Sequence, residues 1–241
     1  MLARHRTLVV VAALFVVSCL VASCGGGSSR TAASPAASAS STAHGDAAAY
    51  QQFQDAATRF AALPAYAVTY NARVNNPAGA SFSAAVAFTH KGSVTRVQLD
   101  GTVNGKETHF ATIQDGSTLT LCQSPTSSCI RTTADKANAN PLSSLDPVGI
   151  LKTVAADPSM TIAPAAQQTF AGIAGACYTV TQQTQKSTFC VDPATGILLL
   201  AVGQSTAATG TQPFTESIAA TAVSTAVTAV DTSTPYPLAT S

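Results

Sequence analysis

The feature that most constrains the fold of this chain is a stretch from Tyr66 to Leu121 in which apolar residues alternate with polar or small ones. A period of two residues is typical of β-strands that bury one face. Turn-forming residues interrupt the alternation at Asn75-Asn76-Pro77, Asn104-Gly105 and Asp115-Gly116. An Asn-Gly pair between two alternating runs is a strong signal of a β-hairpin. The stretch therefore predicts a meander of adjacent antiparallel strands with one apolar face.

Segments with helical periodicity lie on both sides of this meander. The first follows Asp46, a favourable N-cap, and ends before Pro64. Its apolar face is formed by Tyr50, Phe53, Ala57, Phe60 and Ala61. The second begins at Ser144 or Asp146 and ends at Asp157-Pro158. Its apolar side is formed by Val148, Leu151, Val154 and Ala155. Such stripes are typical of helices that pack on a core.

A second β region follows the shorter helix. We expect strands over residues 169–173, 177–181, 188–191 and 197–202, and one or two closing strands over residues 214–230. Asp192-Pro193-Ala194-Thr195-Gly196 is a turn between the third and fourth of these strands. The sequence therefore predicts an α+β fold in a single domain over residues 46–237, followed by a tail over residues 238–241.

The N-terminus has the pattern of a lipoprotein signal peptide. Arg4 and Arg6 precede an apolar run over residues 7–21, which is shorter than the about 20 residues of a membrane span. The run ends in Leu20-Val21-Ala22-Ser23-Cys24, which resembles a bacterial lipobox. We expect residues 1–23 to be removed and the sulfur of Cys24 to carry a diacylglycerol. The alternatives are lipidation at Cys19, cleavage after Ser23 without a lipid, and an uncleaved anchor.

Residues 24–45 separate this signal from the predicted domain. They are mostly Gly, Ala, Ser and Thr and show no apolar periodicity, so we expect a disordered tether. The tether and the acylated Cys24 would hold the domain on the outer side of the cell membrane. The location expected from these segments is therefore extracytoplasmic, with a lipid anchor.

The charge balance argues against one class of partner. The chain has 12 Lys and Arg residues against 11 Asp and Glu residues, a formal net charge of +1. Two of the basic residues, Arg4 and Arg6, leave with the signal peptide, and the remaining charges form no run or patch. We therefore expect no binding to nucleic acid and no electrostatic binding to anionic lipid heads.

Four cysteines remain in the chain after Cys24, and their spacing favours two disulfides. Cys122 and Cys129 lie symmetrically about one predicted hairpin turn, and Cys177 and Cys190 lie symmetrically about another. Residues directly opposite each other across a hairpin are close enough to form a disulfide. The alternative is a zinc site, but the spacings are too wide for paired ligands and no histidine lies near the second pair. Two disulfides agree with a location outside the cytoplasm.

The order of elements and one local run resemble a known fold family. The run consists of Ile173-Ala174-Gly175-Ala176-Cys177 and then Cys190-Val191-Asp192-Pro193-Ala194-Thr195-Gly196-Ile197-Leu198. It is similar to the glycine, strand, strand, D-x-x-T-G-hydrophobic run of envelope lipoproteins with the LolA-like carrier fold, which LppX and LprG share. The resemblance implies a strongly curved antiparallel sheet, a half-barrel, with the N-terminal helix and a short helical insertion packed on its concave face. In that family the gap between sheet and helices takes up acyl chains, and no family residue can be assigned to a position here.

If the register holds, one set of apolar residues lies on the concave face. The set is Tyr66, Val68, Tyr70, Phe82, Val86, Phe88, Val97, Leu99, Phe110, Leu119, Leu121, Tyr178, Val180 and Phe189. The candidates for ligand contact within it are Tyr70, Phe82, Val86, Phe88, Leu99, Phe110 and Tyr178. Two interpretations remain open: the helices fill this face as an ordinary core, or they pack loosely and leave a slot for acyl chains.

The sequence contains no catalytic or cofactor-binding motif. There is no nucleophile elbow, P-loop, dinucleotide-binding fingerprint or His-Glu-x-x-His zinc motif. His44 falls in the tether, His90 lies at a strand end, and Glu107 and His109 share one side of a predicted strand. We expect a protein that is not an enzyme and that needs no metal or cofactor. The first hypothesis is a carrier of lipid or another amphiphile, and the second is an anchored module with a filled core and an envelope protein partner.

Overall fold

The computed structural model describes residues 44–75, 81–124, 126–133, 145–183, 185–205 and 214–239. The predicted signal peptide, the lipidation site at Cys24, the alternative site at Cys19 and the predicted tether up to residue 43 lie outside these residues. So do Ser144, which is one of two predicted helix caps, and the predicted turn residues Asn76 and Pro77.

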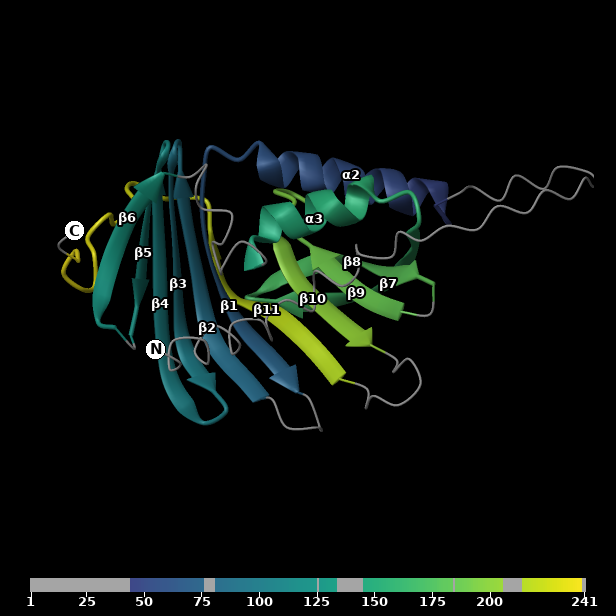
Figure 1. Cartoon of the computed structure of the whole chain (residues 1–241). Coiled ribbons are helices and arrows are strands. Elements are labelled where there is room, and N and C mark those ends of the chain that lie inside the picture. Colours follow the sequence, from purple (N-terminus) through teal and green to yellow (C-terminus); the bar gives the residue numbers. More distant parts are fainter. Residues whose placement is uncertain are drawn as a thin grey trace, which may run out of the picture.

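The described residues form one antiparallel sheet and two helices, which confirms the predicted α+β class (Figure 1). The helices are α2 (Ala47–Ala61) and α3 (Pro147–Ala156). The strands are β1 (Ala65–Asn75), β2 (Ser81–Lys91), β3 (Val94–Val103), β4 (Lys106–Asp115), β5 (Thr118–Gln123), β6 (Ser128–Thr133), β7 (Thr161–Phe170), β8 (Ile173–Gln182), β9 (Gln185–Val191), β10 (Leu198–Ser205) and β11 (Phe214–Ser224). Their order in the sheet is β6-β5-β4-β3-β2-β1-β11-β10-β9-β8-β7. The closing strand β11 therefore joins the two halves of the sheet by pairing with both β1 and β10.

Both helices lie on the same face of the sheet (Figure 1). The apolar face of α2 is buried there, and the ring of Phe53 meets Tyr178 of β8 and Phe189 of β9 edge-on, with ring centroids 5.4 and 5.9 Å apart. One residue of this face is predicted wrongly: Ala61 is exposed, and Ala56 is buried in its place. Neither described helix is long and apolar enough to cross a membrane.

A carboxylate caps each helix, as the sequence predicts. Asp46 accepts a hydrogen bond from the backbone N–H of Ala49 at 2.8 Å and begins α2. Asp146 accepts the N–H groups of Val148 and Gly149 at 3.1 and 3.0 Å and begins α3. Caps of this kind satisfy backbone donors that have no partner inside the helix.

The first strand predicted in the second β region is wrong. Residues 169–173 do not form one strand, because Ala171 and Gly172 have φ angles of 50° and 78° and turn the chain between β7 and β8. Positive φ at both central residues is the geometry of a tight hairpin turn. The strand before this turn is missed because it contains Pro164, which argues against a central strand. Proline is tolerated here because β7 is an edge strand.

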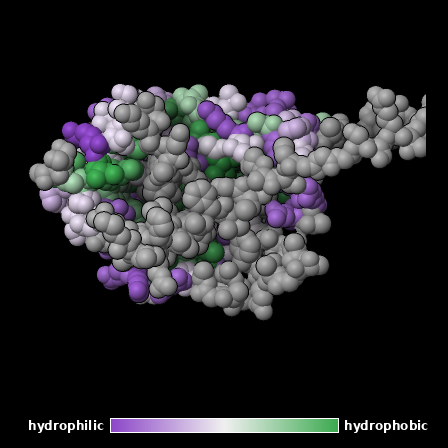
Figure 2. All heavy atoms as spheres, in the orientation of Figure 1, coloured by the Kyte–Doolittle hydropathy of each residue, from purple (hydrophilic) through white to green (hydrophobic). Residues whose placement is uncertain are grey.

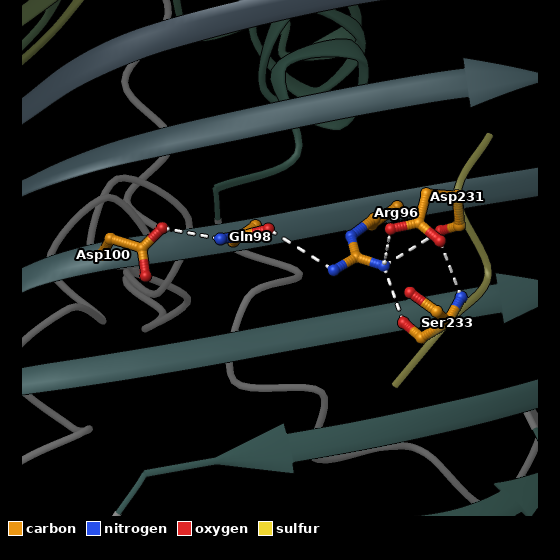
Figure 3. Close-up of polar contacts among 5 residues, drawn as sticks. All are labelled: Arg96, Gln98, Asp100, Asp231 and Ser233. Atoms are coloured by element: carbon orange, nitrogen blue, oxygen red, sulfur yellow. Dashed lines mark hydrogen bonds and ion pairs between the residues drawn. The ribbon is translucent and has the colours of Figure 1, made fainter. Parts of the chain in front are cut away.

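The C-terminal residues after β11 do not form a second closing strand. They run as a strap, residues 225–239, across the outer face of the sheet, which is the face away from the helices (Figure 1). Arg96 of β3 holds the strap through an ion pair with Asp231 at 3.2 Å and hydrogen bonds to the carbonyls of Asp231 and Ser233 at 3.0 and 2.8 Å (Figure 3). The strap therefore covers part of the face that the helices leave open.

Each edge of the sheet is covered by a terminal segment of the fold. At β6, the N–H of Cys129 donates to the carbonyl of Pro237 at 2.9 Å, and the N–H of Ala239 donates to the carbonyl of Cys129 at 2.8 Å. At β7, the N–H of Ile162 donates to the carbonyl of His44 at 2.9 Å, and the N–H of Asp46 donates to the carbonyl of Ile162 at 3.0 Å. Covered edges protect a sheet from pairing with other chains.

These contacts move both predicted domain boundaries outward. His44 is expected in the tether, but its ring stacks on Tyr50 with centroids 4.2 Å apart. Leu238 is expected in the tail, but it forms a bridge with Cys129. The ordered fold therefore extends at least from His44 to Ala239.

Both predicted disulfides are present. Cys122 of β5 is bonded to Cys129 of β6, and Cys177 of β8 is bonded to Cys190 of β9. In each pair the two residues are direct partners in the strand register, with Cα atoms 4.1 and 4.0 Å apart. The first disulfide packs with Ala111 and Tyr236 of the strap in a small cluster separate from the main core.

The Asp192–Gly196 turn, between β9 and β10, packs against α2. Asp192 accepts hydrogen bonds from the N–H of Ala194 and the hydroxyl of Thr195, which closes the turn. Gly196 has a φ of 78° and lies directly against the helix, so that a Cβ atom there would collide with the carbonyl oxygen of Ala56. The glycine of this motif is therefore required both by its backbone angle and by the close approach of α2.

We predict that Gly196→Ala destabilises the fold by at least about 2 kcal/mol more than Gly172→Ala, because only the first adds a clash to the strain of a positive φ. Gly172 is a matched control, since it has the same φ of 78° and, apart from its two chain neighbours, no heavy atom of the described residues lies within 4 Å of the position that an added Cβ would take. Urea unfolding of the two variants and the unchanged protein measures the difference. If both variants lost the same free energy of unfolding, the added methyl group at residue 196 would not collide with α2.

Candidate functional site

A cavity of about 340 Å³ lies on the helix-covered face, at one end of the strand meander. Its walls come from the end of α2, the start of α3 and the adjacent ends of β1 to β5. The apolar lining residues are Phe60, Ala61, Leu63, Tyr66, Phe88, Val97, Leu119 and Val148, and the polar ones are His90, Thr95, Thr112, Gln114 and Asp146. This volume falls at the lower end of the range for small-molecule sites.

The register of the strands explains why polar and apolar groups are separated in this cavity. Tyr66, His90, Thr95, Gln114 and Leu119 are successive cross-strand partners and form one row across β1 to β5. The next row toward the middle of the sheet contains Val68, Phe88, Val97, Thr112 and Leu121. The outermost row is therefore mainly polar, and the row behind it is mainly apolar.

His90 is fixed in place by its neighbours in the polar row. Its Nδ1 lies 2.9 Å from the hydroxyl oxygen of Thr95, and its ring stacks on Tyr66 with centroids 5.2 Å apart. Burial lowers the pKa of His90, and the nearby carboxylate of Asp146 opposes this effect. A neutral imidazole offers one donor and one acceptor, so His90 can bind a polar group without carrying charge.

Asp146 has two roles, since it caps α3 and also lines the cavity. Burial raises the pKa of its carboxyl group, while the hydrogen bonds from Val148 and Gly149 and the charges of Lys152 and His90 lower it. Burial also raises the pKa of Tyr66, and the negative charge of Asp146 adds to that effect. The polar end of the cavity therefore contains one ionisable carboxyl group beside neutral hydrogen-bonding groups.

Of the residues predicted to contact a ligand, Phe88 lines this cavity. Tyr70, Phe82, Val86, Leu99 and Tyr178 are buried members of the main core, and Phe110 is half-buried against it. The buried side chain of Tyr70 fills the middle of the sheet, and its hydroxyl donates a hydrogen bond to the carbonyl of Leu198 at 2.8 Å. Three members of the larger predicted set, Tyr66, Val97 and Leu119, do line the cavity. The middle of the meander is thus a filled core, and a cavity lies at one end of it.

Sequence reasoning misses the polar residues of this site. It places His90 only at a strand end, and it does not single out Thr95 and Gln114. The register of the β2–β3 and β3–β4 hairpins would have placed these three in one row. Asp146 could not be found this way, because it follows the meander by many residues and reaches the row only through packing of α3. His109, in contrast, lies on the outer face and pairs with Asp100 at 2.8 Å, so Glu107 is not its partner.

A second ionisable group lies on the same face of the sheet, away from the cavity. Glu216 of β11 is the register partner of Val74, two positions along β1 from the buried Ala72. In the described part of the chain its buried Oε1 atom has no hydrogen-bond partner. Burial raises the pKa of Glu216 from 4.5 to about 7. This carboxyl group is therefore partly protonated near neutral pH.

We predict that the protein loses stability as the pH rises from about 5 to about 7. In this window the folded state holds a proton on Glu216 that the unfolded state has already released, so a higher pH favours unfolding. The loss is at most about 3 kcal/mol, and it is complete above the folded pKa. Glu216→Gln should remove this pH dependence in urea unfolding, whereas Glu107→Gln, at an exposed position on the outer face, should keep it. If the free energy of unfolding changed with pH to the same extent in both variants, groups other than Glu216 would be the cause.

In the described part of the chain, the polar side chains around the cavity make few contacts with one another. Among the described residues, no three His, Cys, Asp or Glu side chains are close enough together to hold a metal ion. The His90 ring forms a hydrogen bond with Thr95, and Asp146 affects His90 through its charge.

Comparison with known proteins gives a likeness of fold and nothing at the level of residues. No protein-family model matches the chain, and no curated protein does. Solved structures do match, at low sequence identity.

Three of these structures illustrate the range. MucB has 15% identity and a TM-score of 0.47, with 78% of this chain and 62% of that chain covered. The lipoprotein LppX of Mycobacterium tuberculosis has 11% identity and a TM-score of 0.44, with 73% and 94% covered. A LolA superfamily protein of Nitrosomonas europaea has 10% identity and a TM-score of 0.32, with 73% and 92% covered. The chain thus spans less than two thirds of the length of MucB.

Proposed function

We propose that this protein is a lipid-anchored envelope protein that binds an amphiphile without chemical conversion. The observation that carries the proposal is the 340 Å³ cavity, with a polar row at its end and an apolar row behind it. An amphiphile has the same division, since it joins a polar head to a hydrocarbon chain. Phe88 and Val97 would contact the chain, while His90 and Gln114 would contact the head.

The proposal includes the curvature of the sheet and the place of the protein in the cell. A sheet bent into a half-barrel around α2 and α3 would make the cavity the open end of its concave face. Two disulfides agree with an oxidising compartment, which favours a position outside the cytoplasm. Acylated Cys24 would anchor the chain there, with residues 25–43 as the tether.

Native mass spectrometry tests the ligand. The mature chain without its lipid, residues 24–241 with Cys24→Ala, is exported by a cleavable signal peptide so that its disulfides form. We predict a co-purifying amphiphile that is lost in Gln114→Trp, because Gln114 lines the cavity from an exposed position and a larger side chain there fills the space.

Glu107→Trp is the control, since it places the same side chain on the outer face of the same strand. We expect this variant to retain the ligand. A bare mass for the unchanged domain after gentle purification, or equal retention by both Trp variants, would contradict binding in the cavity.

The anchor has a separate test. Metabolic labelling with a palmitate analogue should label the full chain, and Cys24→Ala should abolish the label, because the thiol of Cys24 is the acylated group. Cys19→Ala is the matched control and should keep the label. Loss of label in the Cys19 variant alone would move the lipidation site to the alternative cysteine, and equal labelling of both variants would exclude a lipid on Cys24.

An interaction module for an envelope protein is the second candidate function. Hydrophobic residues reach the surface at the β5–β6 end of the sheet (Figure 2), and Ile130 of β6 is 52% exposed beside its register partner Leu121. Exposed apolar groups of this kind are typical of contact surfaces. Two results together would favour this candidate over the first. The mature chain would carry no ligand, and a protein partner that co-purifies with it would be lost in Ile130→Ser but kept in the adjacent control Arg131→Ser.

A further inference from the structure

The charge of the cavity lining is one-sided. Asp146 is the acidic residue among the lining residues, and none of the described lining residues is Lys or Arg. The other polar groups are the imidazole of His90, two threonine hydroxyls and the amide of Gln114, which carry no charge when His90 is neutral. A ligand entering this site therefore meets a negative group and, among the described lining residues, no positive side chain.

Asp146 can still bind a ligand although it caps α3. Each of its two carboxylate oxygens accepts one backbone N–H, at 3.1 Å from Val148 and 3.0 Å from Gly149. A carboxylate oxygen can accept a second hydrogen bond, so both oxygens keep capacity. Asp146 also has no ion-pair partner among the described residues; Lys152 lowers its pKa from a distance but forms no salt bridge with it.

Aromatic rings also line the cavity. Three of the lining residues are aromatic and largely buried: Phe60, Tyr66 and Phe88. Phe60 and Tyr66 meet edge-on with centroids 4.9 Å apart, and Tyr66 stacks on His90. The faces of aromatic rings attract cations, and quaternary ammonium groups are recognised in this way. A carboxylate and several aromatic rings together are therefore complementary to an organic cation.

We infer that the cavity selects a cationic amphiphile, in which a primary or quaternary amine is joined to a hydrocarbon chain. The amine lies between Asp146 and the ring of Tyr66 in the polar row, and the chain follows the apolar row of Phe88 and Val97. An anionic head would face the charge of Asp146, and no basic side chain of the described lining would compensate for it, which disfavours anionic ligands. This inference rests on the proposed function, because it names the class of amphiphile that the cavity holds.

Three ligands with chains of the same length separate charge from hydrophobicity. Dodecyltrimethylammonium is cationic, 1-dodecanoylglycerol is neutral and dodecanoate is anionic. Isothermal titration of the delipidated mature chain with each, below its critical micelle concentration and at low salt, measures the three dissociation constants. We expect the cation to bind about tenfold more tightly than the neutral ligand, as one cation–π or carboxylate contact allows, and the anion to bind most weakly.

Two variants test the role of the carboxylate. Asp146→Asn removes the charge and keeps a side chain that caps helices well, so the preference for the cation should disappear while the neutral ligand binds as before. Asp157→Asn, at the other end of α3, is the matched control and should change nothing. Gln114→Lys adds a positive charge at an exposed lining position and should reverse the order of cation and anion, which keeps the test valid if Asp146→Asn unfolds.

The outcomes distinguish this inference from the proposed function. Equal binding of all three ligands, or a neutral ligand that binds most tightly, would overturn the charge selectivity and leave an amphiphile-binding cavity. Tightest binding of dodecanoate would overturn it in the same way. Failure of all three to bind would overturn the proposed function together with the inference.

Discussion

Eleven adjacent strands with a spacing of about 4.8 Å make a sheet about 48 Å wide, and one face of it carries most of the large apolar side chains. Helix α2 has 15 residues and is about 22 Å long, and α3 is shorter. Two such helices do not cover a flat sheet of this width, so the face has to bend toward them or stay partly open. Toward the β7 edge the helix packs closely on the sheet, with Phe53 of α2 against Tyr178 of β8 and Phe189 of β9. The cavity over β1 to β5 is where the cover ends.

Because the helices cover only part of the sheet, the residue rows near its open end differ in composition from the rows in its middle. The row in the middle of the meander strands is large and apolar, as the buried partners Tyr70, Val86 and Leu99 show. Toward the end of the meander the partners become His90, Thr95 and Gln114, which tolerate contact with water or with a polar group. On the opposite face no helix is present among the described residues, and Arg96 holds the strap there (Figure 3). Tyr236 of the strap packs on the disulfide of Cys122 and Cys129.

Local signals in the sequence determine much of this fold. The meander, both helix caps and both disulfide pairs follow from alternation, turn residues and spacing, because each depends on neighbours in the chain. Strand β7 is misplaced because Pro164 hides an edge strand and because Ala171 adopts a backbone angle more typical of glycine. The polar end of the cavity is missed for another reason. Asp146 meets the row of His90 only through the packing of α3, and no sequence period records a contact of that kind.

The bridge between Gly45 and Ile162 has a mechanical consequence if the chain is anchored at Cys24 as proposed. A pull from the membrane passes through the tether and reaches the folded part first at the two hydrogen bonds that join residues 44–46 to β7. Strand β7 is the edge farthest in the sheet order from β6, and the cavity lies in the half that contains β1 to β5. Load therefore enters the fold at the β7 border of the sheet and meets these two hydrogen bonds before it reaches α2, whose C-terminal end lines the cavity.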